Sequence, residues 1–159
     1  MGIGLTLQQL EGWQGQYESM LRWRNRVVEA ANGEPSADEL DFLLAFFQAA
    51  HHLRDWLDKT RAVQTSDTDA FIGAHAELGI CRDIANGFKH HSITRPSVDA
   101  EFAIVNQYVD PEWLGRKYRF PNGEWTVLAN GHQFGLVELS ERIVELWKAF
   151  LTSKGLSPG

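Results

Sequence analysis

The stretch Ser36–Lys59, with the sequence SADELDFLLAFFQAAHHLRDWLDK, carries the clearest structural pattern in this chain of 159 residues. Its apolar residues recur every three or four positions, which is the period of an α-helix. They form one stripe: Leu40, Leu43, Leu44, Phe47, Ala50, Leu53 and Leu57. Phe42, Phe46 and Trp56 widen this stripe, so the helix needs more than one neighbour to bury it. The stretch therefore predicts a long core helix within a helical bundle.

Helical periodicity also predicts a helix on each side of this stretch and another at the end of the chain. The first runs through the N-terminal segment and ends at Asn32-Gly33, because a glycine after the last periodic residue is a stop signal. After a polar loop at 60–70, one continuous helix runs from Phe71 to about 88–91. The last helix begins at Leu136, and a frayed tail follows at about 153–159.

The pattern changes to strand spacing between the third of these helices and the last. Apolar and polar residues alternate around Val127, and Ile104 with Val105 indicates an earlier strand. Pro121-Asn122-Gly123 is typical of a turn, because proline presets one backbone angle and glycine accepts a positive φ. We therefore expect a hairpin over residues 116–130.

Together these elements predict a single, mainly α domain that spans residues 1–159. We expect a four-helix up-and-down bundle. A small antiparallel β-hairpin or three-stranded sheet is inserted at about 100–131, before the last helix. The broad apolar faces of the helices also suit a homodimer.

The composition limits the class of function. The chain has 15 Lys and Arg against 21 Asp and Glu, a formal net charge of -6. Any nucleic-acid site must therefore be a local cluster of basic residues. Cys81 is the single cysteine, which excludes an internal disulfide framework and suits the reducing cytosol. No apolar run is long enough to span a bilayer and the first residues lack a signal-peptide pattern, so we expect a cytoplasmic protein without a membrane segment.

The most informative polar run is CRDIANGFKHHSITR, at residues 81–95. Arg82, Asn86 and His90 are spaced four apart, so they share one face if the helix continues, with Lys89 close by. Basic residues outnumber acidic ones here, and arginine binds phosphate through parallel hydrogen bonds. Histidine exchanges protons near neutral pH. This set therefore suits phosphate binding, or the cleavage of RNA without a metal.

A purely structural interpretation of the same run remains open. Lys89 and the histidines that follow it stand near the expected end of a helix, where positive charge offsets the negative end of the helix dipole. Asn86-Gly87 is also an ordinary helix-stop pair. Cationic helix ends are far more common than active sites, so on this interpretation the run only terminates the helix.

The second helix adds two pairs of residues at helical spacing. His51 and Asp55 are four apart and can form an oriented histidine or two metal ligands, whereas Arg54 and Asp58 suit a surface ion pair. No HExxH motif or other recognisable ligand set is present, so no metal site is predicted. Phosphate-cradling motifs such as GxxxxGK[ST] and GxGxxG are also absent, and we expect no cofactor.

Three runs carry a resemblance to known proteins: FFQAAHHLRDWL at 46–57, CRDIANGFKHHSI at 81–93 and GLVELSERIVELWKAFL at 135–151. The set resembles a group of uncharacterised bacterial and phage-associated proteins with the pattern LRDW, then NGxKH, then a final helix with a tryptophan. That group is similar to HEPN-like helical domains. The resemblance implies a helical bundle, frequent dimerisation, and either metal-independent RNA cleavage or the binding of RNA or nucleotides.

The resemblance also implies roles for particular residues. In the wider HEPN class the catalytic signature is an arginine, four to six residues, and then a histidine. Arg82 and His90 come closest to it here, with seven residues between them. They are the candidate catalytic pair of a ribonuclease. Arg54, Asn86, Lys89 and His91 are the candidate ligand-binding residues. The alternative function is a non-catalytic homodimeric interaction module.

Overall fold

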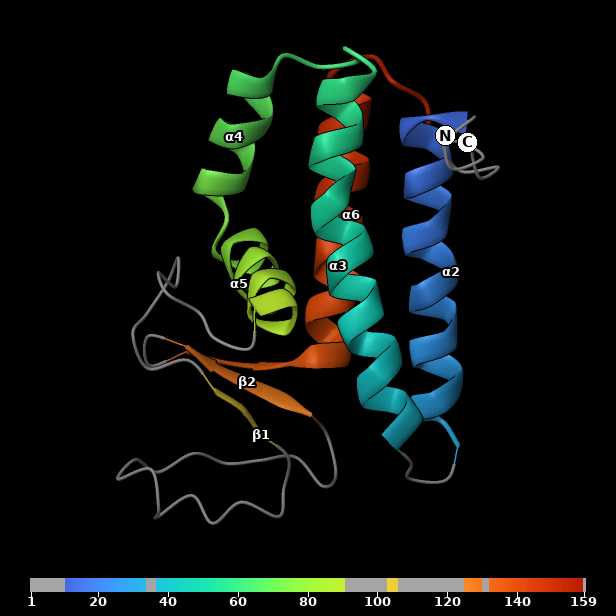
Figure 1. The fold of residues 1–159 in the computed structure, drawn as a ribbon, viewed down its shortest axis with the longest axis vertical. Helices are drawn as coiled ribbons and strands as arrows, with labels where there is room; N and C mark the ends of the chain where they lie inside the picture. Colours follow the sequence, from blue (N-terminus) through green and yellow to red (C-terminus); the bar gives the residue numbers. More distant parts are fainter. Residues whose placement is uncertain (1–10, 34–36, 91–102, 106–124, 130–131, 159) are drawn as a thin grey trace, which may run out of the picture.

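The structure is a computed structural model that describes residues 11–33, 37–90, 103–105, 125–129 and 132–158 (Figure 1). It is mainly helical, as the sequence predicts. The helices and strands, in chain order, are α2 (Trp13–Ala31), α3 (Ala37–Lys59), α4 (Thr65–Ala74), α5 (Ala76–His90), β1 (Ala103–Val105), β2 (Thr126–Ala129), β3 (His132–Gly135) and α6 (Leu136–Ser153). Within the described residues, no helix is both long and apolar enough to cross a membrane.

Three long helices, α2, α3 and α6, form the main part of the bundle. α2 and α3 run in opposite directions side by side, and α6 packs against both of them (Figure 1). Gln16 of α2 reaches across to α3, where its Nε2 donates a hydrogen bond to the carbonyl of Ala49 at 2.9 Å. The predicted stripe of α3 is buried at its centre, where Leu43, Phe47 and Leu53 are fully inaccessible to solvent.

The third predicted helix is two helices, and the prediction of one continuous helix is wrong. α4 begins at Thr65, so the polar loop is shorter than expected, and the helix ends at Ala74. His75 then takes an extended conformation, with φ -126 and ψ 117, before α5 begins. Figure 1 shows the consequence: α4 lies beside the upper half of α3, whereas α5 turns away from the axis of α4.

Aromatic packing on α6 explains why the chain breaks at this point. The ring of Phe71 stacks on Phe150, with 4.2 Å between centroids and an interplanar angle of 12°. It also meets the buried Trp147 edge-on at 5.2 Å. A helix continuing from Thr65 to His90 would be a straight rod about 39 Å long. The break at His75 allows α4 to hold Phe71 on α6 while α5 packs its own apolar face on α3.

The described strands form one antiparallel sheet in the order β1-β2-β3. β2 is central, because Ile104 of β1 pairs with Val127 on one edge and Phe134 of β3 pairs with Val127 on the other. Both edges of β2 are therefore occupied. The predicted hairpin over 116–130 is wrong in its pairing, and residues 116–124 lie outside the described residues. The sheet also reaches Gly135, beyond the predicted limit at 131.

The chain after α6 continues in an ordered turn rather than the expected frayed tail. The backbone N–H of Leu156 donates to the carbonyl of Leu151 at 2.9 Å, and that of Gly155 donates to Thr152 at 3.0 Å. Gly155 has a φ of 73. This pattern is a Schellman motif, in which a left-handed residue closes the helix. Leu156 packs on the core, which fixes the turn.

Candidate functional site

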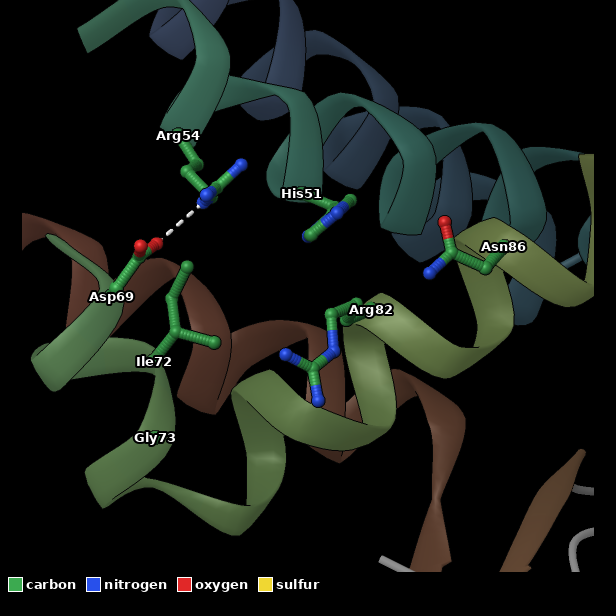
Figure 2. A pocket seen from close by; sticks show the side chains of 7 residues that line it. All are labelled: His51, Arg54, Asp69, Ile72, Gly73, Arg82 and Asn86. Atoms are coloured by element: carbon green, nitrogen blue, oxygen red, sulfur yellow. Dashed lines mark hydrogen bonds and ion pairs between the residues drawn. The ribbon is translucent and has the colours of Figure 1, made fainter. Parts of the chain in front are cut away.

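An open pocket of about 500 Å³ lies between α3, α4 and α5. Each of the three helices contributes polar side chains to its wall (Figure 2). The lining residues are His51 and Arg54 from α3, Asp69, Ile72 and Gly73 from α4, and Arg82 and Asn86 from α5. The structure thus brings together Arg54, Arg82 and Asn86, three of the candidate site residues predicted from the sequence.

The packing of α5 on α3 sets the register of these side chains. Cys81 is fully buried in this contact, and its Sγ donates a hydrogen bond to the carbonyl of Phe47 at 3.4 Å. Arg82 follows Cys81 directly, and His51 stands one helical turn after Phe47. Arg82 of α5 and His51 of α3 therefore border the same space, which the sequence alone did not determine.

The break at His75 supplies the third wall of the pocket. Because α4 folds back beside α3, Asp69 and Ile72 face the end of Arg54 (Figure 2). Ile72 is buried, so it anchors α4 and gives the pocket an apolar side. At the break itself, Nδ1 of His75 lies 3.0 Å from the carbonyl of Phe71. A continuous helix would carry Asp69 away from Arg54.

Arg54 is held by two carboxylates, which are not the one that the sequence predicts. Its Nε donates to Oδ1 of Asp69 at 2.7 Å, and its Nη1 lies 3.3 Å from Oδ1 of Asp55. The predicted partner, Asp58, instead accepts a hydrogen bond from the hydroxyl of Thr65. The hydrogen bond from Arg54 lowers the pKa of Asp69 below its ordinary value and raises that of the guanidinium. Both groups therefore stay charged at neutral pH.

His51 is a neutral histidine among charged groups. Burial lowers its pKa from 6.5 to about 4; the carboxylate of Asp55 opposes this shift, and His52, Arg54 and Arg82 add to it. Its ring points from α3 into the space bordered by Arg82 and Asn86 (Figure 2). At pH 7 the imidazole has one nitrogen that accepts a hydrogen bond and one that donates. It can therefore bind a polar ligand and receive a proton from it or from water.

On α5, the predicted face begins as expected. Arg82 and Asn86 are exposed, one helical turn apart, and both line the pocket. The helix continues to His90, so its backbone keeps the four-residue spacing of the predicted set. The side chains of Lys89 and His90, and all of His91, lie outside the described residues. The pairing of Arg82 with His90 thus stays a prediction.

Sequence reasoning missed the contribution of α4 to this site. The sequence predicts a loop or the start of a helix at Asp69, Ile72 and Gly73, and no local pattern links these residues to Arg54. The spacing of His51 and Asp55 predicts an oriented histidine or two metal ligands, and it does not place His51 beside Arg82. Among the residues that the structure describes, no group of three His, Cys, Asp or Glu side chains gathers to hold a metal ion.

Comparison with models of known protein families, with curated proteins and with solved structures gives no match for this chain. The resemblance to HEPN-like domains therefore rests on the three sequence runs quoted above. In the pocket itself, two guanidinium groups, a carboxylate, an amide and a neutral imidazole surround a space of about 500 Å³.

Proposed function

We propose that the pocket between α3, α4 and α5 binds a phosphate group of RNA or of a nucleotide. The observation that carries this proposal is the convergence of Arg54, Arg82 and Asn86 from two helices on one open pocket. Arginine recognises phosphate through two parallel, charge-assisted hydrogen bonds. The amide of Asn86 adds a donor and an acceptor for a neighbouring sugar or base.

The charge of the pocket supports an anionic ligand. Its lining residues include two positive guanidinium groups and one negative carboxylate, while the whole chain has a net charge of -6. The pocket is therefore more positive than the average of the chain. Its volume of about 500 Å³ falls within the usual range for small-molecule sites, and buried Ile72 offers an apolar surface to a sugar or base.

If the pocket is catalytic, the proposed activity is that of a metal-independent ribonuclease. A histidine takes the proton of a ribose 2′-hydroxyl, and the 2′-oxygen bonds to phosphorus. The bond from phosphorus to the 5′-oxygen breaks, and this oxygen takes a proton from water, so the products are a 2′,3′-cyclic phosphate and a 5′-hydroxyl. Arg82 stabilises the charge that develops on the phosphoryl oxygens. The resemblance to HEPN-like domains nominates His90 as this histidine. Without such a step, the same pocket serves a protein that binds RNA or nucleotides and does not cleave them.

The experiment measures binding and cleavage of labelled single-stranded RNA by the full chain at low salt in the presence of EDTA. Arg54→Ala and Arg82→Ala should each weaken binding about tenfold or more, because each removes charge-assisted hydrogen bonds to phosphate. Arg22→Ala is the matched control. Arg22 is an exposed arginine on α2, which lies on the opposite side of α3 from the pocket (Figure 1).

Two results would contradict the proposal. One is an RNA affinity that stays unchanged in Arg54→Ala and Arg82→Ala. The other is an equal loss of RNA affinity in the control variant Arg22→Ala, which would indicate general electrostatic attraction. If the His90→Ala variant still cleaves RNA, His90 is not the catalytic histidine, and the proposed binding site is unaffected. Light scattering on the same samples tests the proposed homodimer, since the resemblance implies a mass of twice 18.0 kDa.

A further inference from the structure

Asp69 already binds one of the arginines that the proposed function assigns to a phosphate. Its Oδ1 accepts a hydrogen bond from Nε of Arg54 at 2.7 Å, and Asp69 is itself one of the residues that line the pocket. Figure 2 shows Asp69 on α4 facing the guanidinium of Arg54 on α3 at the same end of the pocket. A carboxylate of the chain therefore interacts with this arginine where a phosphate would bind.

The geometry of the guanidinium group makes this interaction a competing one. A guanidinium offers two pairs of parallel N–H bonds, one from Nε and Nη2 and the other from Nη1 and Nη2. In Arg54, Asp69 accepts from Nε of the first pair, and Oδ1 of Asp55 lies 3.3 Å from Nη1 of the second. A phosphate that binds Arg54 through two parallel hydrogen bonds therefore displaces one of these carboxylates. Asp69 lines the pocket and Asp55 does not, so a ligand in the pocket meets Asp69.

The electrostatic surroundings of Asp69 are those that an anionic ligand would experience. The hydrogen bond from Arg54 lowers the pKa of Asp69, burial opposes this shift, and the positive charges of Arg54 and Arg82 add to it. The carboxylate is therefore charged at neutral pH and attracted by both arginines. Its side chain is also 51% exposed, so water can solvate the carboxylate when it leaves Arg54.

We propose that Asp69 is a self-inhibitory contact: its carboxylate takes the place of the ligand on Arg54, and a phosphate group of RNA or of a nucleotide binds by displacing it. The hydrogen bond from Nε of Arg54 then passes from Asp69 to a phosphate oxygen, and the side chain of Asp69 turns to solvent. No covalent bond changes. This inference rests on the proposed function, since it assumes that the pocket binds phosphate, and it adds how the affinity of that site is set.

Helix α4 keeps its position during this exchange, because contacts away from Arg54 hold it. Ile72 is buried, and Oδ2 of Asp67 accepts a hydrogen bond from Nζ of Lys154 at 2.9 Å. The exchange therefore needs only a rotation of the Asp69 side chain. An exposed ion pair of this kind is weak, so the competition should reduce the affinity of the ligand by up to about fivefold.

The test measures the affinity of the full chain for labelled single-stranded RNA and for a nucleoside 5′-monophosphate, at neutral pH and low salt in the presence of EDTA. Asp69→Asn should tighten binding by about two- to fivefold. Asp67→Asn is the matched control, because it removes the same charge from the same helix but pairs with Lys154 instead of Arg54. It should change the affinity less than about twofold. If the nucleotide and RNA differ in their response to Asp69→Asn, the one that responds is the ligand of the pocket.

A double-mutant cycle with Arg54→Ala separates competition from simple repulsion. Asp69→Asn removes the repulsion between the carboxylate and the ligand in any background, but it removes competition only where Arg54 is present. The gain in affinity from Asp69→Asn should therefore be at least about twofold smaller in the Arg54→Ala background than in the wild type. An equal or larger gain without Arg54 would mean that Asp69 acts by its charge alone, and it would overturn the inference.

The outcomes separate this inference from the function on which it rests. If Asp69→Asn weakens binding, Asp69 orients Arg54 for the ligand instead of competing with it. In that case, or if the affinity stays unchanged, the inference is overturned and the phosphate site stands. If neither RNA nor the nucleotide binds to the wild type or to Asp69→Asn, the proposed function falls, and the inference falls with it. Urea unfolding of each variant verifies that it is folded, as expected for the replacement of an exposed carboxylate by an amide of the same shape.

Discussion

Replacement of His51 by glutamine should remove a large part of the acid sensitivity of this protein. In the folded chain, burial holds the pKa of His51 at about 4, against 6.5 for an unburied histidine. Above pH 6.5 the ring is neutral in both the folded and the unfolded state and makes no difference to stability. Below pH 6.5 the unfolded chain takes up a proton that the folded chain does not, so the folded state loses stability as the pH falls towards 4.

The difference between a pKa of 6.5 and one of about 4 corresponds to about 3 kcal/mol when the titration is complete. At pH 4.5 most of this, about 2.5 kcal/mol, should already be lost. Other groups also titrate in this range. The quantity to follow is therefore the free energy of unfolding of the wild type minus that of His51→Gln. It should be constant from pH 8 to 7 and fall by about 2.5 kcal/mol towards pH 4.5.

Urea unfolding followed by tryptophan fluorescence measures this difference directly, because the chain has six tryptophans and two of them, Trp13 and Trp147, are buried. His52→Gln is the matched control: it makes the same change at the next residue, where the side chain is exposed. A flat difference for His51→Gln, or an equal slope for both variants, would refute the assignment of a neutral, partly desolvated His51.

Three further predictions address other parts of the structure. Gly155→Ala should destabilise the fold by about 1–2 kcal/mol, because φ at this residue is 73. Gly73→Ala in helix α4 should stabilise the fold by about 0.5–1 kcal/mol, because no atom lies within 4 Å of the added carbon. Urea unfolding that gives both changes in stability the same sign would contradict this. Cys81 is buried, and burial raises the pKa of its thiol, so a thiol reagent should modify it only when the chain unfolds. Rapid labelling of Cys81 under native conditions would contradict this prediction. Arg54→Ala should lower the free energy of unfolding by less than about 1 kcal/mol, because the ion pair with Asp69 is partly exposed, and it should weaken RNA binding. A large loss of stability with unchanged RNA binding would contradict this prediction.

The helices of the bundle could be predicted because each has an amphipathic pattern that repeats along its own sequence. The stripe on α3 is buried as expected, and α2 and α6 begin or end within a few residues of the predicted positions at Gly33 and Leu136. A pattern of this kind depends only on which face of a helix meets the core. The pattern can therefore be recognised from the sequence without knowing which helix packs against that face.

The sheet shows where local patterns are ambiguous. Both Pro121-Asn122-Gly123 and Asn130-Gly131 are sequences typical of turns, and the second pair separates β2 from β3. A two-residue Asn-Gly connection is in fact the stronger hairpin signal. The hairpin predicted over 116–130 uses the first of these turns. The structure pairs Val127 with Phe134, which lies beyond the second turn sequence. The other edge of β2 pairs with β1, a segment far away in the chain, and no local turn sequence indicates that contact.

By itself, the sequence determined the helical class, the net charge of -6 and the local group of basic residues that begins with Arg82. It did not determine the pocket. The break at His75 depends on Phe71 stacking on Phe150, a residue far along the chain, and this break is what brings Asp69 to Arg54. The neutral state of His51 likewise depends on burial by neighbouring helices. Helical periodicity is a local property, whereas the convergence of side chains and the desolvation of a titratable group arise only when separate helices pack together.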